Sequence, residues 1–187
     1  MPALTMQPEP GRLFLVVGPS GVGKDSVLDM ARADFEGSPN VVFPKRFITR
    51  TADAGGEDHI AIAASTFIAR RAAGDFVLSW QAHSFYYGIS KGICADIDAG
   101  RHVVVNVSRT VIKQAQERFA HVTVIAITAK PEVIAERLKR RGRETDAEIA
   151  KRLERAALSL PSDADIQTID NSGTLADALT AFRQIIA

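Results

Sequence analysis

The chain has 187 residues, 46% of them hydrophobic and 24% charged, and its 23 basic and 22 acidic residues nearly cancel to a formal charge of +1. This composition excludes a disordered chain, a coiled coil and a collagen-like repeat, and it lacks the basic excess typical of nucleic-acid-binding proteins. The length favours one domain with room for a small insert. The single cysteine, Cys94, cannot form an internal disulfide, which favours a reducing compartment.

Residues 1–11 are predicted to be a disordered lead-in, because three prolines fall within the first ten residues. This segment has neither the basic region nor the apolar run of a secretory signal. The longest uninterrupted apolar runs, such as Leu13 to Val17, are far too short to cross a membrane. We therefore expect a cytoplasmic protein without a membrane partner.

After residue 12 the pattern alternates between strand-like and helix-like segments. Strands are predicted at residues 13–17, 41–48, 76–80, 102–107, 122–128 and 166–169. Helices are predicted at about 24–35, 65–73, 91–99, 132–141, 145–160 and 175–186. Pro44 makes the second strand an edge strand or a broken one. Pro131 suits a first helical position, and Thr145 with Glu148 forms a capping-box pattern.

This alternation predicts an α/β fold in three layers, with a parallel sheet covered on both faces by helices. We expect one domain over residues 12–187. The alternation is broken between about 43 and 90, which predicts an inserted substrate subdomain.

Gly18-Pro19-Ser20-Gly21-Val22-Gly23-Lys24 matches the G-x-x-x-x-G-K phosphate loop, directly after a predicted strand and at the start of a predicted helix. Glycines let backbone N–H groups turn toward a phosphate, and the helix N-terminus adds positive potential. Lys24 is expected to face solvent when no nucleotide is bound and to reach the transferred phosphoryl group. The predicted ATP site comprises Gly18, Pro19, Ser20, Gly21, Val22, Gly23, Lys24, Asp25 and Ser26.

Asp25 departs from the motif, since the residue after the lysine is usually Ser or Thr, whose hydroxyl binds Mg²⁺. A carboxylate is also a good Mg²⁺ ligand, so Asp25, with Ser26 beside it, is the predicted metal site. The alternative is that Asp25 only stabilises the first helical turn. No predicted strand ends in an aspartate, and the nearest candidate strand ends Val105-Asn106-Val107-Ser108.

Residues 137–155 hold eight basic and four acidic side chains, a local charge of +4. An excess of arginine on a helix–glycine–helix segment predicts a lid over a nucleotide, at about residues 137–152. Arginine forks stabilise the charge that develops on phosphate oxygens. Arg137, Arg141 and Arg152 are the predicted catalytic arginines alongside Lys24, whereas Lys139, Lys151 and Arg155 fit ordinary surface ion pairs.

Together with the phosphate loop, three further segments resemble the guanylate-kinase-like branch of the P-loop nucleoside monophosphate kinases. They are Ile48-Thr49-Arg50, the run from Tyr86 to Lys91, and the arginines of the lid. The resemblance covers nearly the whole chain after Arg12. Guanylate kinases read guanine with two carboxylates, and the matching positions here are Ser79 and Ser108. Asp53 stands where that family has a second phosphate-binding arginine.

In these departures the chain resembles the ribose 1,5-bisphosphate phosphokinases of phosphonate breakdown, a group within that family. The shared segments are Gly23-Lys24-Asp25-Ser26, Ala54-Gly55-Gly56-Glu57 and Asn106-Val107-Ser108-Arg109. This resemblance implies transfer of the ATP γ-phosphoryl group to the 1-phosphate of ribose 1,5-bisphosphate, giving 5-phosphoribosyl 1-diphosphate. A phosphate acceptor needs positioning and charge neutralisation rather than a general base.

The implied partners are therefore ATP, Mg²⁺ and a small anionic sugar phosphate, and no nucleic acid. Candidate acceptor-binding residues are Arg46, Arg50, Glu57, Tyr87, Ser108 and Arg109. Two alternatives stay open: a guanylate or other nucleoside monophosphate kinase, and a non-catalytic guanylate-kinase-like binding domain. The presence of Lys24 and the lid arginines argues against the second.

Overall fold

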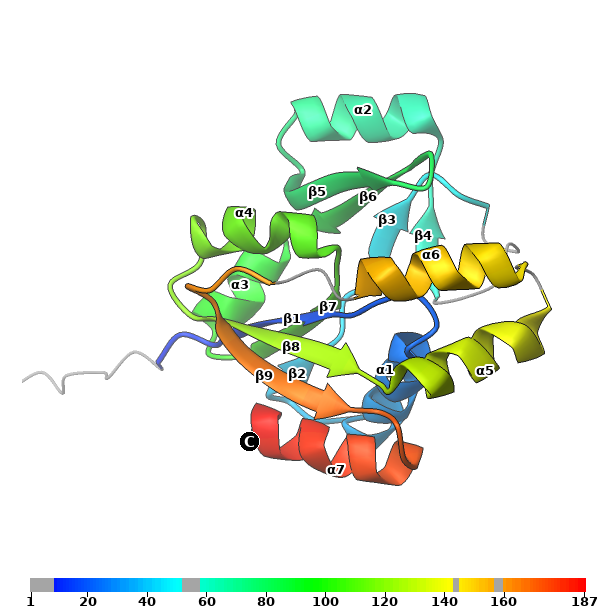
Figure 1. Ribbon diagram of the computed structural model, residues 1–187. Coiled ribbons are helices and arrows are strands. Elements are labelled where there is room, and N and C mark those ends of the chain that lie inside the picture. The colour runs from blue at the N-terminus through cyan, green and yellow to red at the C-terminus, as the bar shows by residue number, and fades with distance from the viewer. Residues whose placement is uncertain (1–8, 52–57, 143–144, 157–159) are drawn as a thin grey trace, which may run out of the picture.

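The computed structural model of the chain describes residues 9–51, 58–142, 145–156 and 160–187. For Arg141, Asp146, Arg152 and residues 154–156 it describes the backbone alone. The described residues form two sheets, one of five strands and one of four, with helices packed around them (Figure 1).

The larger sheet is parallel throughout and confirms the predicted α/β fold. Its strand order is β2-β7-β1-β8-β9. Their bounds are Val41–Val42 for β2, His102–Asn106 for β7, Leu13–Val17 for β1, Val122–Thr128 for β8 and Asp165–Asp170 for β9. All five residues of β1 are buried, which explains why this strand is one continuous apolar run.

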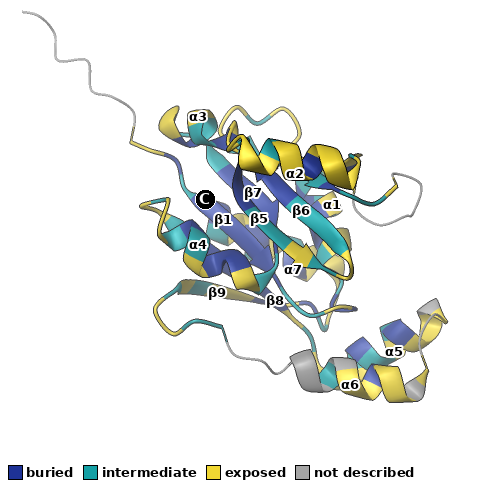
Figure 2. Cartoon of the chain, turned by 90° about the horizontal axis from the view of Figure 1, so that it is seen from above, coloured by how far each residue is buried: buried dark blue, intermediate teal, exposed yellow. Residues whose placement is uncertain are grey.

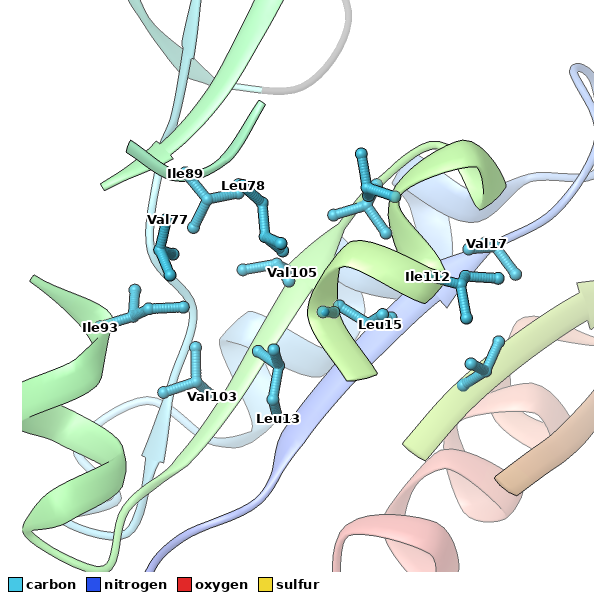
Figure 3. Packing of buried hydrophobic residues seen from close by; sticks show 14 of the residues in the cluster. Leu13, Leu15, Val17, Val77, Leu78, Ile89, Ile93, Val103, Val105 and Ile112 are labelled. Atoms are coloured by element: carbon cyan, nitrogen blue, oxygen red, sulfur yellow. The ribbon is translucent and has the colours of Figure 1, made fainter. Parts of the chain in front are cut away.

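Helices cover both faces of this sheet. The face with α1 (Lys24–Asp34) and α7 (Leu175–Ile186) buries Phe14, Val16 and Phe182. The opposite face, with α3 (Ile93–Asp98) and α4 (Ile112–Gln116), buries Leu13 and Leu15 (Figure 3). Successive residues of a strand point to opposite faces, so β1 supplies both cores. Because β1, β7, β8 and β9 are parallel, their carboxyl ends lie at the same edge of the sheet, where the residues that follow them can form a site.

The smaller sheet is built from residues 46–90 in the order β4-β3-β6-β5. Its strands are His59–Ala61 for β4, Arg46–Ile48 for β3, Phe85–Ser90 for β6 and Phe76–Ala82 for β5. Helix α2 (Ala64–Ala72) covers one face, where the Phe67 ring stacks on Phe76 at 4.6 Å and on Tyr86 at 5.4 Å. Leu78 and Ile89 belong instead to the core that contains Leu15, so the other face packs toward the larger sheet.

Helices α5 (Pro131–Arg141) and α6 (Asp146–Ala156) pack against each other and extend from the larger sheet as a hairpin (Figure 2). Leu138 and Ile149 are both buried in the core of α1 and α7. The predicted capping box is confirmed: the Thr145 N–H donates to Glu148 Oε2 at 2.8 Å, and the Glu148 N–H donates to Thr145 Oγ1 at 3.3 Å. None of the helices in the described ranges is long and apolar enough to cross a membrane.

The structure corrects the predicted elements in three places. The strand expected at 41–48 is two strands in different sheets, because the chain leaves β2 before Pro44 and begins β3 at Arg46. Strands β4 and β6 were not predicted, since β4 is only three residues long and β6 contains Gly88. The turn η2 (Arg109–Val111) and α4 were also missed, because both are short.

Candidate active site

The phosphate loop lies between the end of β1 and the start of α1, as predicted. A Cβ atom on Gly18 would lie 2.4 Å from the Ile127 carbonyl oxygen. Gly23 has a φ of +91°, and its Cβ would lie 2.6 Å from Asn171 Nδ2. Both positions require glycine because strand ends and side chains of the sheet edge approach the loop backbone closely.

Lys24 does not extend into solvent, so that expectation is wrong. Its Nζ donates to the carbonyl oxygens of Gly18 at 2.7 Å and Pro19 at 3.1 Å, and the side chain is half-buried. The ammonium group is thus held inside the loop, at the place where phosphate oxygens are expected.

Asp25 meets a residue from the neighbouring strand. The buried side chain of Asn106, at the end of β7, donates from Nδ2 to Asp25 Oδ1 at 3.4 Å. The register of the sheet sets this meeting, because Asn106 is the partner of Val16 near the end of β1. Asp25 itself is exposed at the first turn of α1. The sequence pointed to the strand end 105–108, but not to this contact.

Arg137 joins the loop to the far edge of the sheet. Its Nη1 donates to the Val22 carbonyl at 3.1 Å, and its Nη2 donates to the Asn171 carbonyl at 2.9 Å. Asn171 is 1% exposed, and its Nδ2 donates to the same Val22 oxygen at 2.8 Å. The structure thus places Arg137 beside the phosphate loop. The side chains of Arg141 and Arg152 lie outside the described residues.

Asn171 is a site residue that sequence reasoning missed. It directly follows β9, and its N–H donates to the Thr128 carbonyl at 2.7 Å. The available signal was its position just after a predicted parallel strand, because the carboxyl ends of such strands meet at one edge.

Arg50 follows β3, and its backbone is held on two sides. The His59 ring, which is 8% exposed, donates from Nε2 to the Arg50 carbonyl oxygen at 3.2 Å. The preceding residue, Thr49, accepts the Tyr86 N–H on its hydroxyl at 2.9 Å. His59 therefore fixes the segment that carries Arg50, which supports a structural rather than a substrate-contacting role for this histidine.

Arg46 and Tyr87 lie together on the smaller sheet. The guanidinium carbon of Arg46 is 5.6 Å from the centroid of the Tyr87 ring, and that ring stacks on Trp80 at 5.2 Å. Beside β3, Lys45 Nζ lies 2.6 Å from Asp58 Oδ2, and this hydrogen bond holds the pKa of Asp58 below its usual range.

Ser108 and Arg109 begin the η2 turn, two and three residues after Asn106. The Ser108 hydroxyl accepts the Thr110 N–H at 3.3 Å and the Thr110 hydroxyl at 2.9 Å. The N–H of Ser79, the other serine at a position where guanylate kinases have a carboxylate, donates to Gln114 Oε1 at 3.3 Å. Glu57 and Asp53 lie outside the described residues.

The donor set at the loop suits a metal that also binds phosphates. In the described part of the chain, no group of three or more His, Cys, Asp or Glu side chains gathers in one place. Mg²⁺ commonly takes one or two protein carboxylates and completes its octahedron with water and substrate phosphates. Asp25, exposed next to Lys24, supplies a carboxylate of the required kind.

A family model described as guanylate kinase matches residues 10–187. The ribose 1,5-bisphosphate phosphokinase of Acidiphilium cryptum is 49% identical over 179 residues, which cover 96% of this chain and 94% of that relative. The enzyme of the same name from Agrobacterium fabrum is 41% identical over 174 residues, covering 93% of this chain and 95% of the relative. The crystal structure of guanylate kinase from Anaplasma phagocytophilum matches with a TM-score of 0.67 and 19% identity, over 97% of this chain and 87% of its own. That last likeness concerns the fold alone.

Proposed function

The chain belongs to the guanylate kinase family, and we propose that it transfers the γ-phosphoryl group of ATP to the 1-phosphate of ribose 1,5-bisphosphate. An oxygen of the 1-phosphate attacks the γ-phosphorus, the bond from that phosphorus to the bridging oxygen breaks, and ADP leaves. The product is 5-phosphoribosyl 1-diphosphate. A requirement for ATP as donor and the single cysteine favour a cytoplasmic location. The resemblance to the ribose 1,5-bisphosphate phosphokinases implies a role in phosphonate breakdown.

One observation carries this proposal. Two relatives that are 41% and 49% identical to this chain over nearly its whole length are named ribose 1,5-bisphosphate phosphokinases. The residues agree with it, because Ser79 and Ser108 offer no anionic acceptor for the N1–H and amino group of guanine. A site that leaves such donors unpaired rejects its mismatched ligand strongly.

At the donor side, the loop backbone is expected to surround the ATP phosphates, with Lys24 exchanging its two carbonyl contacts for phosphate oxygens. Asp25 and Ser26 are the residues that would hold Mg²⁺, and Asn106 orients the Asp25 carboxylate. When bound, Mg²⁺ neutralises charge on the phosphate oxygens. Arg137 keeps Val22 and the end of β9 in place around the nucleotide.

At the acceptor side, the 1-phosphate is largely ionised near neutral pH, because the second phosphate pKa is about 6. Its oxygen therefore attacks without a general base, and the protein's task is to position two polyanions against each other. Arg50 is the proposed partner of this phosphate, with Glu57, Ser108 and Arg109 beside the ribose. Arg141 and Arg152 are proposed to neutralise the transferring group from α5 and α6.

A phosphorus NMR assay with ATP and Mg²⁺ tests the proposal, with ribose 1,5-bisphosphate and guanosine monophosphate offered as separate acceptors. Each unpaired guanine donor is expected to cost about 1–3 kcal/mol, so kcat/KM should favour the sugar bisphosphate at least about a hundredfold. The expected signal is a pair of phosphorus doublets, because the two phosphorus nuclei of the diphosphate in the sugar product couple to each other. Efficient phosphorylation of guanosine monophosphate without turnover of the sugar bisphosphate would restore the nucleotide kinase alternative.

A further inference from the structure

The turn that begins at Ser108 lies between the phosphate loop and the smaller sheet. Two residues before it, Asn106 donates to Asp25 of the loop. After it, the η2 turn contacts β5 of the smaller sheet. Ser108 caps η2 by accepting the Thr110 N–H on its hydroxyl, and Arg109 is the first residue of η2. The placement of this turn along β5 therefore sets where Ser108 and Arg109 stand relative to the smaller sheet.

Gln114 of α4 makes a directional contact between the two parts. β5 is an edge strand of the smaller sheet, so the N–H groups that point away from β6 need partners outside that sheet. The Ser79 N–H donates to Gln114 Oε1 at 3.3 Å, and both residues are half-buried. N–H groups alternate sides along a strand, so the next one on this side belongs to Gln81, about 7 Å farther along. Gln114 thus selects one position along β5.

The apolar packing around this contact does not make that selection. Ile112 of α4 is buried in the same core as Leu78 of β5 and Ile89 of β6 (Figure 3). Hydrophobic contacts are non-directional, so they hold α4 against the smaller sheet without fixing its position along the strand. A hydrogen bond depends steeply on distance and angle, and an unpaired N–H away from water is costly. The amide of Gln114 therefore supplies the positional part of the contact.

We propose that Gln114 is a positioning residue for the acceptor, which sets the Ser108–Arg109 turn against β5 and thereby places Arg109 for the sugar phosphate. This assignment rests on the proposed function, in which Ser108 and Arg109 bind the acceptor. Gln114 acts through Arg109 and does not itself contact the substrate. Transfer between two bound polyanions depends on their exact placement, so loss of Gln114 should affect the acceptor and leave ATP binding unchanged.

Gln116 offers a matched control on the same helix. It is also half-buried, and its Nε2 donates to the Asp163 carbonyl oxygen at 3.4 Å, in the segment before β9. Gln→Met at either position keeps the length of the side chain and removes its amide. Gln114→Met and Gln116→Met therefore delete the same chemistry from α4, but only the first removes the hydrogen bond to β5.

Steady-state assays with ATP and ribose 1,5-bisphosphate compare the wild type, Gln114→Met, Arg109→Gln, the double variant and Gln116→Met. Gln114→Met should raise the acceptor KM about 10-fold and change the KM for ATP less than about twofold. Arg109→Gln should raise the acceptor KM about 100-fold, because a charge-assisted phosphate contact is lost. The double variant should match Arg109→Gln within about twofold, because a residue that acts through Arg109 adds nothing once Arg109 is gone. Gln116→Met should behave as the wild type.

Trp80 gives a second readout that needs no substrate. It is the only tryptophan in the chain, it directly follows Ser79 in β5, and it packs against the core that contains Ile112. Loosening of the contact between β5 and α4 should expose its ring more often. Gln114→Met should therefore increase the quenching of tryptophan fluorescence by acrylamide, and Gln116→Met should not.

Three results would each overturn the inference in an active enzyme. They are multiplication of the two single effects in the double variant, an equal rise of the KM for ATP and for the acceptor in Gln114→Met, and the same kinetic effect in Gln116→Met. Unchanged quenching in Gln114→Met would overturn the positional role of the hydrogen bond. A wild-type protein that does not phosphorylate ribose 1,5-bisphosphate would instead overturn the proposed function, and the acceptor role of Gln114 with it.

Discussion

The side-chain amide of Asn106 donates to Oδ1 of Asp25 at 3.4 Å and so joins the end of β7 to the first turn of α1. Asn106 is 6% exposed, whereas Asp25 is open to solvent. A buried amide thus holds Oδ1 of the carboxylate, and within the described ranges no hydrogen bond is seen to Oδ2. This arrangement favours the metal role of Asp25 over a role limited to the start of the helix.

Asp25→Asn should raise the Mg²⁺ concentration for half-maximal rate by about 100-fold, with a smaller effect on KM for ATP, because it removes a charged ligand and keeps the shape. Asn106→Ala should shift the same metal titration by about tenfold, as loss of a ligand-orienting partner commonly does. The control is Asp29→Asn, which removes an exposed carboxylate of the same helix that pairs with Arg32. Superimposable titration curves for wild type and Asp25→Asn would assign Asp25 to the helix start.

Lys24→Ala should lower kcat by at least about 1,000-fold, because the ammonium group is proposed to stabilise charge on the transferring phosphoryl group. Its contacts to the carbonyl oxygens of Gly18 and Pro19 lie within the phosphate loop and hold no strand or helix of the core, so the fold should be retained. Thermal unfolding by circular dichroism checks the fold and a coupled ADP assay checks the rate. A rate near that of the wild type would contradict the phosphate-loop assignment.

Gly23→Ala should destabilise the protein more than Gly37→Ala, measured as the free energy of unfolding in urea. Both glycines have positive φ, +91° and +78°, but a Cβ at 23 would meet Asn171 Nδ2 at 2.6 Å, whereas nothing lies within 4 Å at 37. The left-handed conformation alone costs about 1–2 kcal/mol. The additional loss of unfolding free energy at position 23 measures the cost of displacing Asn171. Equal losses in the two variants would show that Asn171 moves away at little cost.

His102 should make stability depend on pH. Burial, together with the nearby charge of Arg12, lowers the pKa of His102 below its ordinary value. The unfolded chain therefore binds more protons than the native protein as the pH falls below about 6.5, so stability is greatest above this range and declines as the pH drops through it. Urea unfolding at pH 8 and pH 5.5 measures the decline, and His102→Asn should reduce it. Equal decline in both proteins would assign the effect to other groups.

The sequence predicted the central strands and helices that depend on local patterns. β1 and β8 have the predicted bounds, because a parallel strand buried on both faces is a continuous apolar run. α7 also has its predicted bounds, and Thr174 with Asp177 caps it reciprocally. The smaller sheet was harder to predict, since β4 leaves Ile60 exposed and therefore lacks a core pattern.

The phosphate loop could be predicted because its chemistry lies in consecutive residues. The contacts of Asn106 and Asn171 could not, because they depend on how β1, β7, β8 and β9 align in the sheet. The stack of Trp80 on Tyr87 likewise depends on the register of β5 and β6, which shifts between Phe76 and Leu78. Registers of this kind are set by tertiary packing and are not readable from one segment.

Arg50→Lys should lower kcat/KM for ribose 1,5-bisphosphate by about 10- to 100-fold, and Arg50→Ala by more, because lysine keeps the charge but lacks the fork that binds two phosphate oxygens. His59 contacts the carbonyl oxygen of residue 50, so both variants keep the hydrogen bond that holds this segment. KM for ATP serves as the internal control and should change less than about threefold. An Arg50→Ala enzyme that keeps its acceptor KM would remove this arginine from the acceptor site and leave Arg46 or Arg109 as the phosphate partner.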